Sequence, residues 1–175
     1  MNNVVIIMRP LITRTASMFG LFKTASFTDP HLGEIRRSSG MWRGTLRLGD
    51  AQMPLILSGS RAAPDPKALS VARSISSGFP SWRPAIERAL FEHYSLYAVA
   101  GTAGQAEPPK LELPVIEGPA AVWPYTTAEF VQVTPLSGQH TVEIGYRVAW
   151  DEEHTLGARL RDGELVELCG SVLAP

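Results

Sequence analysis

The 175-residue sequence contains a single cysteine, Cys169. One cysteine cannot form an intramolecular disulfide, and it excludes a zinc site built from several thiolates. A reducing compartment is the simplest interpretation, so the sequence predicts a cytoplasmic protein. Cys169 has no base and no predicted helix N-terminus beside it in the sequence. We interpret it as a small buried side chain on a strand rather than as a catalytic thiolate.

Long apolar runs and common catalytic signatures are also absent. No stretch approaches the roughly 18 apolar residues of a transmembrane helix, so we expect no membrane partner. The sequence has no glycine-rich phosphate loop, no Gly-x-Ser-x-Gly turn, no His-Glu-x-x-His pair and no Cys-x-x-Cys pair. These absences argue against the common enzyme classes, although they do not exclude an enzyme of another kind. We expect no cofactor.

The charge is small overall but unevenly distributed. The formal net charge is −1, yet residues 1–50 carry seven Lys/Arg against three Asp/Glu, and residues 111–175 carry three against ten. The first segment is thus +4 and the last is −7. The two segments could attract each other in the fold, or the last could present an acidic face to a basic protein partner. The basic residues are scattered and form no stripe, so we expect no nucleic-acid partner.

The length and composition fit one globular domain. Hydrophobic residues make up 45% of the chain and charged residues 19%, values typical of a folded protein. Residues 1–17 lack acidic residues and are interrupted by Pro10, whereas Met18 opens a start-like Met-Phe-Gly-Leu-Phe-Lys. We predict a poorly structured extension over residues 1–17 and a single domain over residues 18–175.

Apolar periodicity predicts strands at both ends of this domain and helices between them. Short turns join segments 32–36, 41–48 and 53–57, which favours an antiparallel meander. Strands are also predicted over 130–133 and 142–150, followed by a hairpin of 156–161 and 164–172 around an Asp162-Gly163 turn.

Two helices are predicted in the middle of the chain. Asp65 before Pro66 is a helix N-cap, and Gly78 would end a helix over residues 67–77. Ser81 would then cap a second helix over residues 82–97. Strands, two helices and strands again predict an α+β domain, a mainly antiparallel sheet with two consecutive helices packed on one face.

One local cluster combines several chemically useful side chains: Trp150, Asp151, Glu152, Glu153 and His154. It lies where the long strand ends and the closing hairpin begins. Carboxylates and an imidazole can perform acid–base chemistry or bind a divalent metal. Consecutive strand residues point to opposite faces, however, so few of them could converge. The alternatives are a solvated turn anchored by Trp150 or a contact with a partner.

The other histidines and tryptophans give weaker signals. His93 lies on the second predicted helix, His31 in a loop and His140 at a strand start, and none has a recognisable metal-ligand spacing. We expect Trp42 and Trp150 to be core anchors. We expect core positions for Trp82 and Trp123 as well, with partial exposure as the alternative, and an exposed tryptophan would be a candidate contact for a partner.

Two segments resemble a bacterial group of small domains of unknown function. The first has the pattern F-x-D-x-x-L-G over residues 27–33, followed by Trp42 and Gly44; the second has the pattern W-D-x-E-H-x-L-G over residues 150–157. The resemblance covers about residues 18–172 and implies no activity. The chain is also similar, in fold class alone, to small α+β immunity proteins that neutralise toxins by binding.

These observations favour a non-enzymatic protein-interaction module, immunity-like in character, that binds a basic partner through its acidic C-terminal half. The segment from Trp150 to His154 is its predicted contact. The alternative is a hydrolase or metal-dependent enzyme centred on Asp151, Glu153 and His154. A third hypothesis is a structural subunit whose exposed strand edge pairs with another copy. Convergence of the three side chains in a concave site would favour the enzyme, and a splayed arrangement would favour the interaction module.

Overall fold

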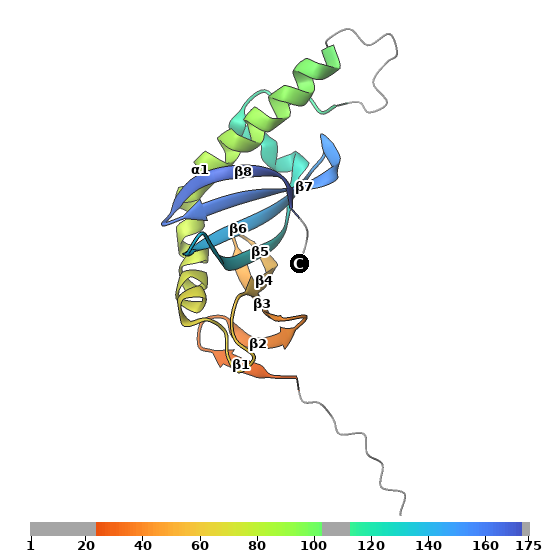
Figure 1. Cartoon of the computed structure of the whole chain (residues 1–175). Coiled ribbons are helices and arrows are strands. Elements are labelled where there is room, and N and C mark those ends of the chain that lie inside the picture. The colour runs from red at the N-terminus through yellow and green to blue at the C-terminus, as the bar shows by residue number, and fades with distance from the viewer. Residues whose placement is uncertain (1–23, 103–112, 173–175) are drawn as a thin grey trace, which may run out of the picture.

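The computed structural model describes residues 24–102 and 113–172 of the chain. One long helix lies along one face of an eight-stranded sheet and runs across its strands (Figure 1). The predicted extension over residues 1–17 falls outside the described residues. No helix in the described ranges is long and apolar enough to cross a membrane. The elements are β1 (Ser26–Asp29), β2 (Gly33–Ser38), β3 (Met41–Leu48), β4 (Ala51–Leu57), α1 (Pro66–Thr102), the 3-10 helix η1 (Pro119–Tyr125), β5 (Thr126–Leu136), β6 (Gln139–Val148), β7 (Asp151–Arg161) and β8 (Glu164–Val172).

The strands lie in the sheet in the same order as in the chain, from β1 to β8. Six neighbouring pairs are antiparallel and joined by short turns. The β4–β5 pair is parallel, and its ladder joins Leu55–Leu57 to Val131–Val133. Parallel neighbours need a long crossover connection, and here α1 and η1 supply it. The sheet thus consists of two meanders joined at one parallel seam.

The predicted fold class is wrong in two respects. The sequence predicts a mainly antiparallel sheet, whereas the sheet is mixed and includes the parallel β4–β5 pair, and α1 is one helix of 37 residues where the sequence predicts two. The buried stripe explains why the helix continues. Leu69, Ala72 and Ile75 lead through Phe79 to Trp82, Ile86, Leu90 and Tyr94 at steps of three or four, without a change of face.

Gly78 is the residue most misread from sequence. It does not end the helix; it makes room for the side chain one turn later. A Cβ placed on Gly78 would lie 2.5 Å from Cζ2 of Trp82. Pro80 and Pro84 also lie inside the helix, where each removes one backbone donor at a cost of about 3 kcal/mol. Burial of the stripe on both sides of these residues outweighs that cost.

The start of α1 confirms the predicted cap. Oδ1 of Asp65 accepts hydrogen bonds from the backbone N–H groups of Lys67 at 2.7 Å and Ala68 at 3.2 Å. Pro66 occupies the first helical position, where its missing N–H costs nothing. His140 Nε2 lies 3.5 Å from the same Asp65 oxygen, which places the start of β6 beside this helix end.

The main core lies between α1 and the sheet. Trp42 and Trp150 are fully buried, as predicted, and Trp82 is almost so, whereas Trp123 is half-buried. Trp42 Nε1 donates to the carbonyl of Ser60 at 2.9 Å, so its one polar atom is satisfied. A smaller cluster of Ile56, Phe130 and Val172, with Cys169 and Met41 packed against it, lies apart from the main core.

The strand boundaries differ from the sequence predictions mostly at their ends. Segment 41–48 matches β3, but β1 is not predicted and β5 is much longer than residues 130–133. The predicted closing hairpin is confirmed as β7 and β8. Its two turn residues have positive φ, 51° at Asp162 and 85° at Gly163, as a type I′ turn requires.

Candidate functional site

Trp150 anchors the segment that the sequence singles out. Its side chain is buried, and its Nε1 donates to Nδ1 of His93 on α1 at 3.0 Å. The Tyr94 ring packs edge-on against it with the ring centroids 5.6 Å apart. The prediction of Trp150 as a core anchor is therefore confirmed, and His93 is a half-buried histidine whose Nδ1 accepts a hydrogen bond from Trp150.

Asp151 and His154 come together in the structure, although a regular strand would separate them. Residues 151–154 belong to strand β7 and not to a turn. The β6–β7 register passes from Arg147↔Thr155 to Val148↔Asp151, so residues 152–154 form an insertion opposite one step of β6. Such a bulge re-aims side chains. It allows His154 Nδ1 to reach Asp151 Oδ1 at 2.9 Å.

Tyr97 of α1 completes this polar cluster. Its hydroxyl donates to Asp151 Oδ2 at 2.6 Å, and its ring lies beside that of His93 with the centroids 5.2 Å apart. Tyr97 is not among the residues predicted from the sequence. The signal was the four-residue spacing of His93 and Tyr97, which places both on one helix face.

The electrostatics of the cluster follow from these contacts. Burial alone would raise the pKa of Asp151, but hydrogen bonds from Tyr97 and His154 outweigh it and lower the pKa. The bond to Asp151 raises the pKa of Tyr97 to about 12. Burial lowers the pKa of His93, which fits its role as an acceptor for Trp150. At neutral pH, Asp151 is an anion held by two donors.

This arrangement resembles half of a catalytic site. With its Nδ1 on Asp151, the His154 ring could use Nε2 as a base, and its side chain is 44% exposed. Glu153, however, is exposed on the surface and does not join the pair. None of five cavities in the described ranges is lined by Asp151, Glu153 or His154. The described residues include no group of three or more His, Cys, Asp or Glu able to hold a metal.

Trp150 and Asp151 thus hold the segment in place, while Glu152, Glu153 and His154 face solvent. The exposed carboxylates belong to a larger feature, the acidic hairpin, which we define as residues 151–172 (β7 and β8). It carries six Asp/Glu and two Arg. Its arginine Arg159 binds Glu143 of β6 at 2.5 Å and Glu167 of β8 at 2.8 Å.

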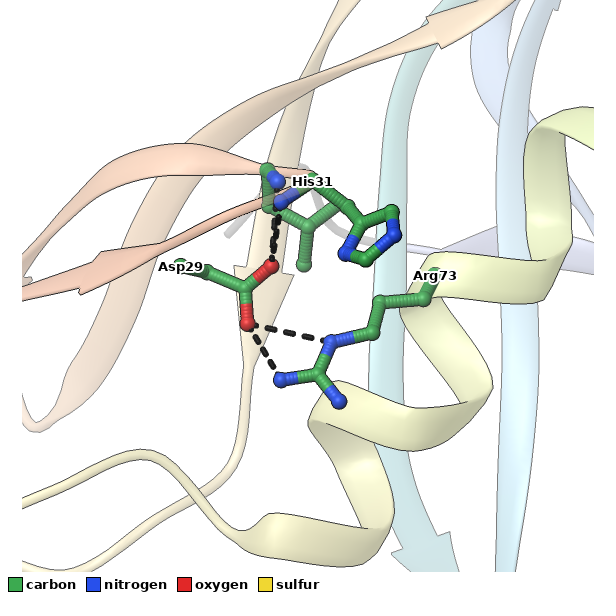
Figure 2. A network of polar contacts seen from close by, with 4 residues as sticks. Asp29, His31 and Arg73 are labelled. Atoms are coloured by element: carbon green, nitrogen blue, oxygen red, sulfur yellow. Dashed lines mark hydrogen bonds and ion pairs between the residues drawn. The ribbon is translucent and has the colours of Figure 1, made fainter.

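The other segment with a recognisable pattern has a structural explanation. Asp29 Oδ1 accepts hydrogen bonds from the backbone of His31 at 2.9 Å and of Leu32 at 3.1 Å, which fixes the β1–β2 turn (Figure 2). Its Oδ2 accepts from Nε and NH2 of Arg73 on α1. Asp29 therefore joins the first hairpin to the helix, and His31 contributes its backbone.

Comparison with known proteins gives a family but no activity. Residues 31–172 match the family described as a domain of unknown function (DUF6985). The chain belongs to this family, because the match covers most of its length. The match includes the segment from Trp150 to Gly157 and begins after Asp29. No curated protein and no solved structure matches the chain.

Proposed function

We propose that this domain is a non-enzymatic protein-interaction module that binds a basic partner through its acidic hairpin. The observation that carries the proposal is the coincidence of two features. The most acidic stretch of the C-terminal half forms the last strand pair of the sheet, and β8 is the edge strand. The acidic hairpin therefore presents both negative charge and a free strand edge.

The edge supplies a mode of binding. Within the described residues β8 pairs with β7 alone, so the backbone N–H and C=O groups on its outer side have no strand neighbour. A partner in extended conformation can add a strand to such an edge through main-chain hydrogen bonds. Val166 of β8 is 53% exposed and offers an apolar contact on the same strand.

The charge selects the partner. Glu152, Glu153 and Glu164 are exposed, and the hairpin has a formal charge of −4 from its six acidic and two arginine residues. Glu164 lies at the turn end of β8, and Glu152 and Glu153 precede Thr155, which pairs with Val172 at its other end. Lysine and arginine side chains near the two ends of an added strand would therefore meet these carboxylates. Charge complementarity of this kind raises association rates and rejects acidic competitors. An immunity-like role, in which the domain covers a basic toxin, is one form of this function.

The enzyme alternative rests on the Asp151–His154 pair alone. Glu153 is exposed, and none of Asp151, Glu153 and His154 lines any of the five cavities. Both observations favour the interaction module. The same pair has a sufficient structural reason, since it fixes the insertion of residues 152–154 above the buried Trp150.

A displayed library of ten-residue strand-forming peptides tests the proposal. We expect selection on the full chain to enrich peptides in which Lys or Arg alternates with β-branched residues. Binding of a selected peptide should weaken as salt rises, because exposed charges are screened. Replacing Glu152, Glu153 and Glu164 together by Gln should weaken it about tenfold or more.

The matched control is Glu117→Gln, which removes an exposed carboxylate outside the hairpin and should leave binding unchanged. Amide hydrogen exchange on the complex should show new protection in β8 and none in the short opposite edge β1. Selected peptides that bind equally well to the triple variant, or that protect β1 instead, would contradict the proposal.

A further inference from the structure

The parallel seam of the sheet opens into a cavity of about 380 Å³. The β4–β5 ladder covers only Leu55–Leu57 and Val131–Val133. Ahead of that ladder in both strands, Ala51 and Met53 of β4 and Thr127 and Ala128 of β5 line the cavity instead. Phe79 and Arg83 of α1 and Trp123 of η1 also line it. The volume lies at the lower end of the range for small-molecule sites, about 300–1,000 Å³.

Aromatic rings form much of its wall. Phe79 of α1, Trp123 of η1 and Tyr146 of β6 all line the cavity. The Phe79 and Trp123 rings meet edge to face with centroids 6.5 Å apart, and those of Trp123 and Tyr146 lie 6.1 Å apart. Such a wall favours a flat apolar body, because aromatic rings pack edge-on or offset against one another.

The Arg83 side chain supplies a positive charge at this wall. The Arg83 guanidinium lies 4.7 Å from the Trp123 ring centroid, and its Nε donates to Glu87 Oε1 at 2.9 Å. Glu87 also accepts a hydrogen bond from Trp123 Nε1, so Arg83 and Trp123 both donate to the same carboxylate. The shared carboxylate holds the guanidinium beside the Trp123 ring. The Arg83 side chain is 50% exposed, which places it at the mouth of the cavity.

Tyr146, one of the residues that line the cavity, carries a buried hydroxyl group. Tyr146 is 1% exposed, and its hydroxyl has no hydrogen-bond partner among the described residues. A buried polar group without a partner is costly, so it is rarely left without a reason. Burial raises the pKa of Tyr146, so the hydroxyl stays protonated and can donate.

We propose that this cavity is a binding site for a small carboxylate that carries one aromatic ring. The ring packs against Phe79, Trp123 and Tyr146. The carboxylate binds the Arg83 guanidinium at the mouth, where an arginine fork matches the two oxygens. The site is independent of the acidic hairpin, so it adds a small-molecule ligand to a domain proposed to bind protein.

Isothermal titration calorimetry on the full chain tests this site with a matched pair of probes. The acid 3-phenylpropanoate and the neutral 3-phenylpropan-1-ol share the same body and differ in charge. We expect the acid to bind more tightly. Arg83→Met should weaken the acid about tenfold and leave the alcohol unchanged, since a hydrogen-bonded charge is worth about that factor. Arg83→Lys should recover part of the loss.

Two variants that fill the cavity test the space separately from the charge, and a third variant is the control. Ala128→Leu fills the space from β5 and should abolish binding of both probes; Ala51→Leu fills it from β4 and serves the same purpose if the first variant unfolds. Arg88→Met removes an exposed arginine from the same helix and should have no effect. The proposal is overturned if neither probe binds, if the alcohol binds as tightly as the acid, or if the filled variants bind like the parent.

Discussion

The Asp29 carboxylate binds the Arg73 guanidinium through two donors, Nε at 3.0 Å and NH2 at 2.5 Å, across 44 residues of sequence. The Asp29 side chain is fully buried, while that of Arg73 is 41% exposed. The carboxylate is thus satisfied by two backbone donors and one arginine, in a place that water does not reach. The pair fastens the first hairpin to the face of α1 (Figure 2).

Replacing this carboxylate by an amide should destabilise the fold. Asn at position 29 can keep the turn contacts to His31 and Leu32, but it loses the charge-assisted bonds to Arg73. We expect Asp29→Asn to lower the free energy of unfolding by about 2 kcal/mol, the scale of a hydrogen bond to a charged group. Urea unfolding at pH 7 measures it. Asp50→Asn, at a fully exposed carboxylate, should change stability by less than about 0.5 kcal/mol.

The same pair predicts a pH dependence with a definite sign. The hydrogen bond from Arg73 lowers the pKa of Asp29 from 3.8 to about 2. A lowered folded-state pKa gives stability that is complete above the unfolded value and is lost as the pH falls through the folded one. The stability difference between the parent and Asp29→Asn should therefore be constant above about pH 5 and shrink between pH 4 and 2. A difference that stays constant down to pH 2 would contradict the assignment.

Gly78 offers a test in which helix propensity and packing predict opposite signs. Alanine in a helix interior normally stabilises by about 0.5–1 kcal/mol relative to glycine. At position 78 the new methyl group would clash with the Trp82 ring. We expect Gly78→Ala to destabilise by about 1–3 kcal/mol, the usual cost of overpacking.

A double-mutant cycle identifies the cause. With Trp82→Leu in place, Gly78→Ala should become neutral or stabilising, because the clash is gone and the propensity remains. Equal destabilisation in both backgrounds would mean that the glycine serves another purpose.

Position 78 also shows why the helix was predicted in two parts. Glycine is a typical residue at a helix end, and a serine three residues later is a typical N-cap, so the prediction divided α1 there. The decisive information was the ring of Trp82, which needs the space above it, and this is a tertiary contact. The cap at Asp65 was predictable because its hydrogen bonds reach only two and three residues along the chain.

The candidate site likewise has features that could be predicted from the sequence and features that could not. Trp150 as an anchor followed from its size and from the apolar alternation before it. The pairing of Asp151 with His154 did not, since it depends on the insertion of residues 152–154 opposite β6. Tyr97 and Arg73, which satisfy Asp151 and Asp29, lie 54 and 44 residues from their partners. No local pattern reveals such distant donors.

The closing turn gives a backbone prediction. Gly163 has a φ of 85°, a conformation that β-branched residues strongly disfavour. Gly163→Val should destabilise the protein by roughly 1–3 kcal/mol, the cost of a strained backbone region. Gly163→Asn should cost less, because asparagine tolerates the left-handed region better than valine does. Denaturation midpoints of the three proteins provide the measurement, and identical midpoints would rule out the type I′ assignment.

The polar cluster around Asp151 yields a prediction about metal content. Protein purified without chelator should contain no stoichiometric metal bound through Asp151 and His154, because Asp151 is already satisfied by Tyr97 and His154. Elemental analysis of the parent and of Asp151→Asn and His154→Ala checks this. A stoichiometric metal lost in both variants would contradict the interaction module and favour the enzyme.

The single parallel seam has a consequence for how the chain reaches its fold. Every other strand pair joins neighbours through a short turn, whereas Leu55 and Val131 lie 76 positions apart. Closing that long loop carries the largest chain-entropy cost of any strand pairing in the sheet. Each meander can collapse from local contacts, and contacts distant in sequence slow folding. We therefore expect the docking of the two meanders along α1 to limit the folding rate, and substitutions at the seam to change that rate.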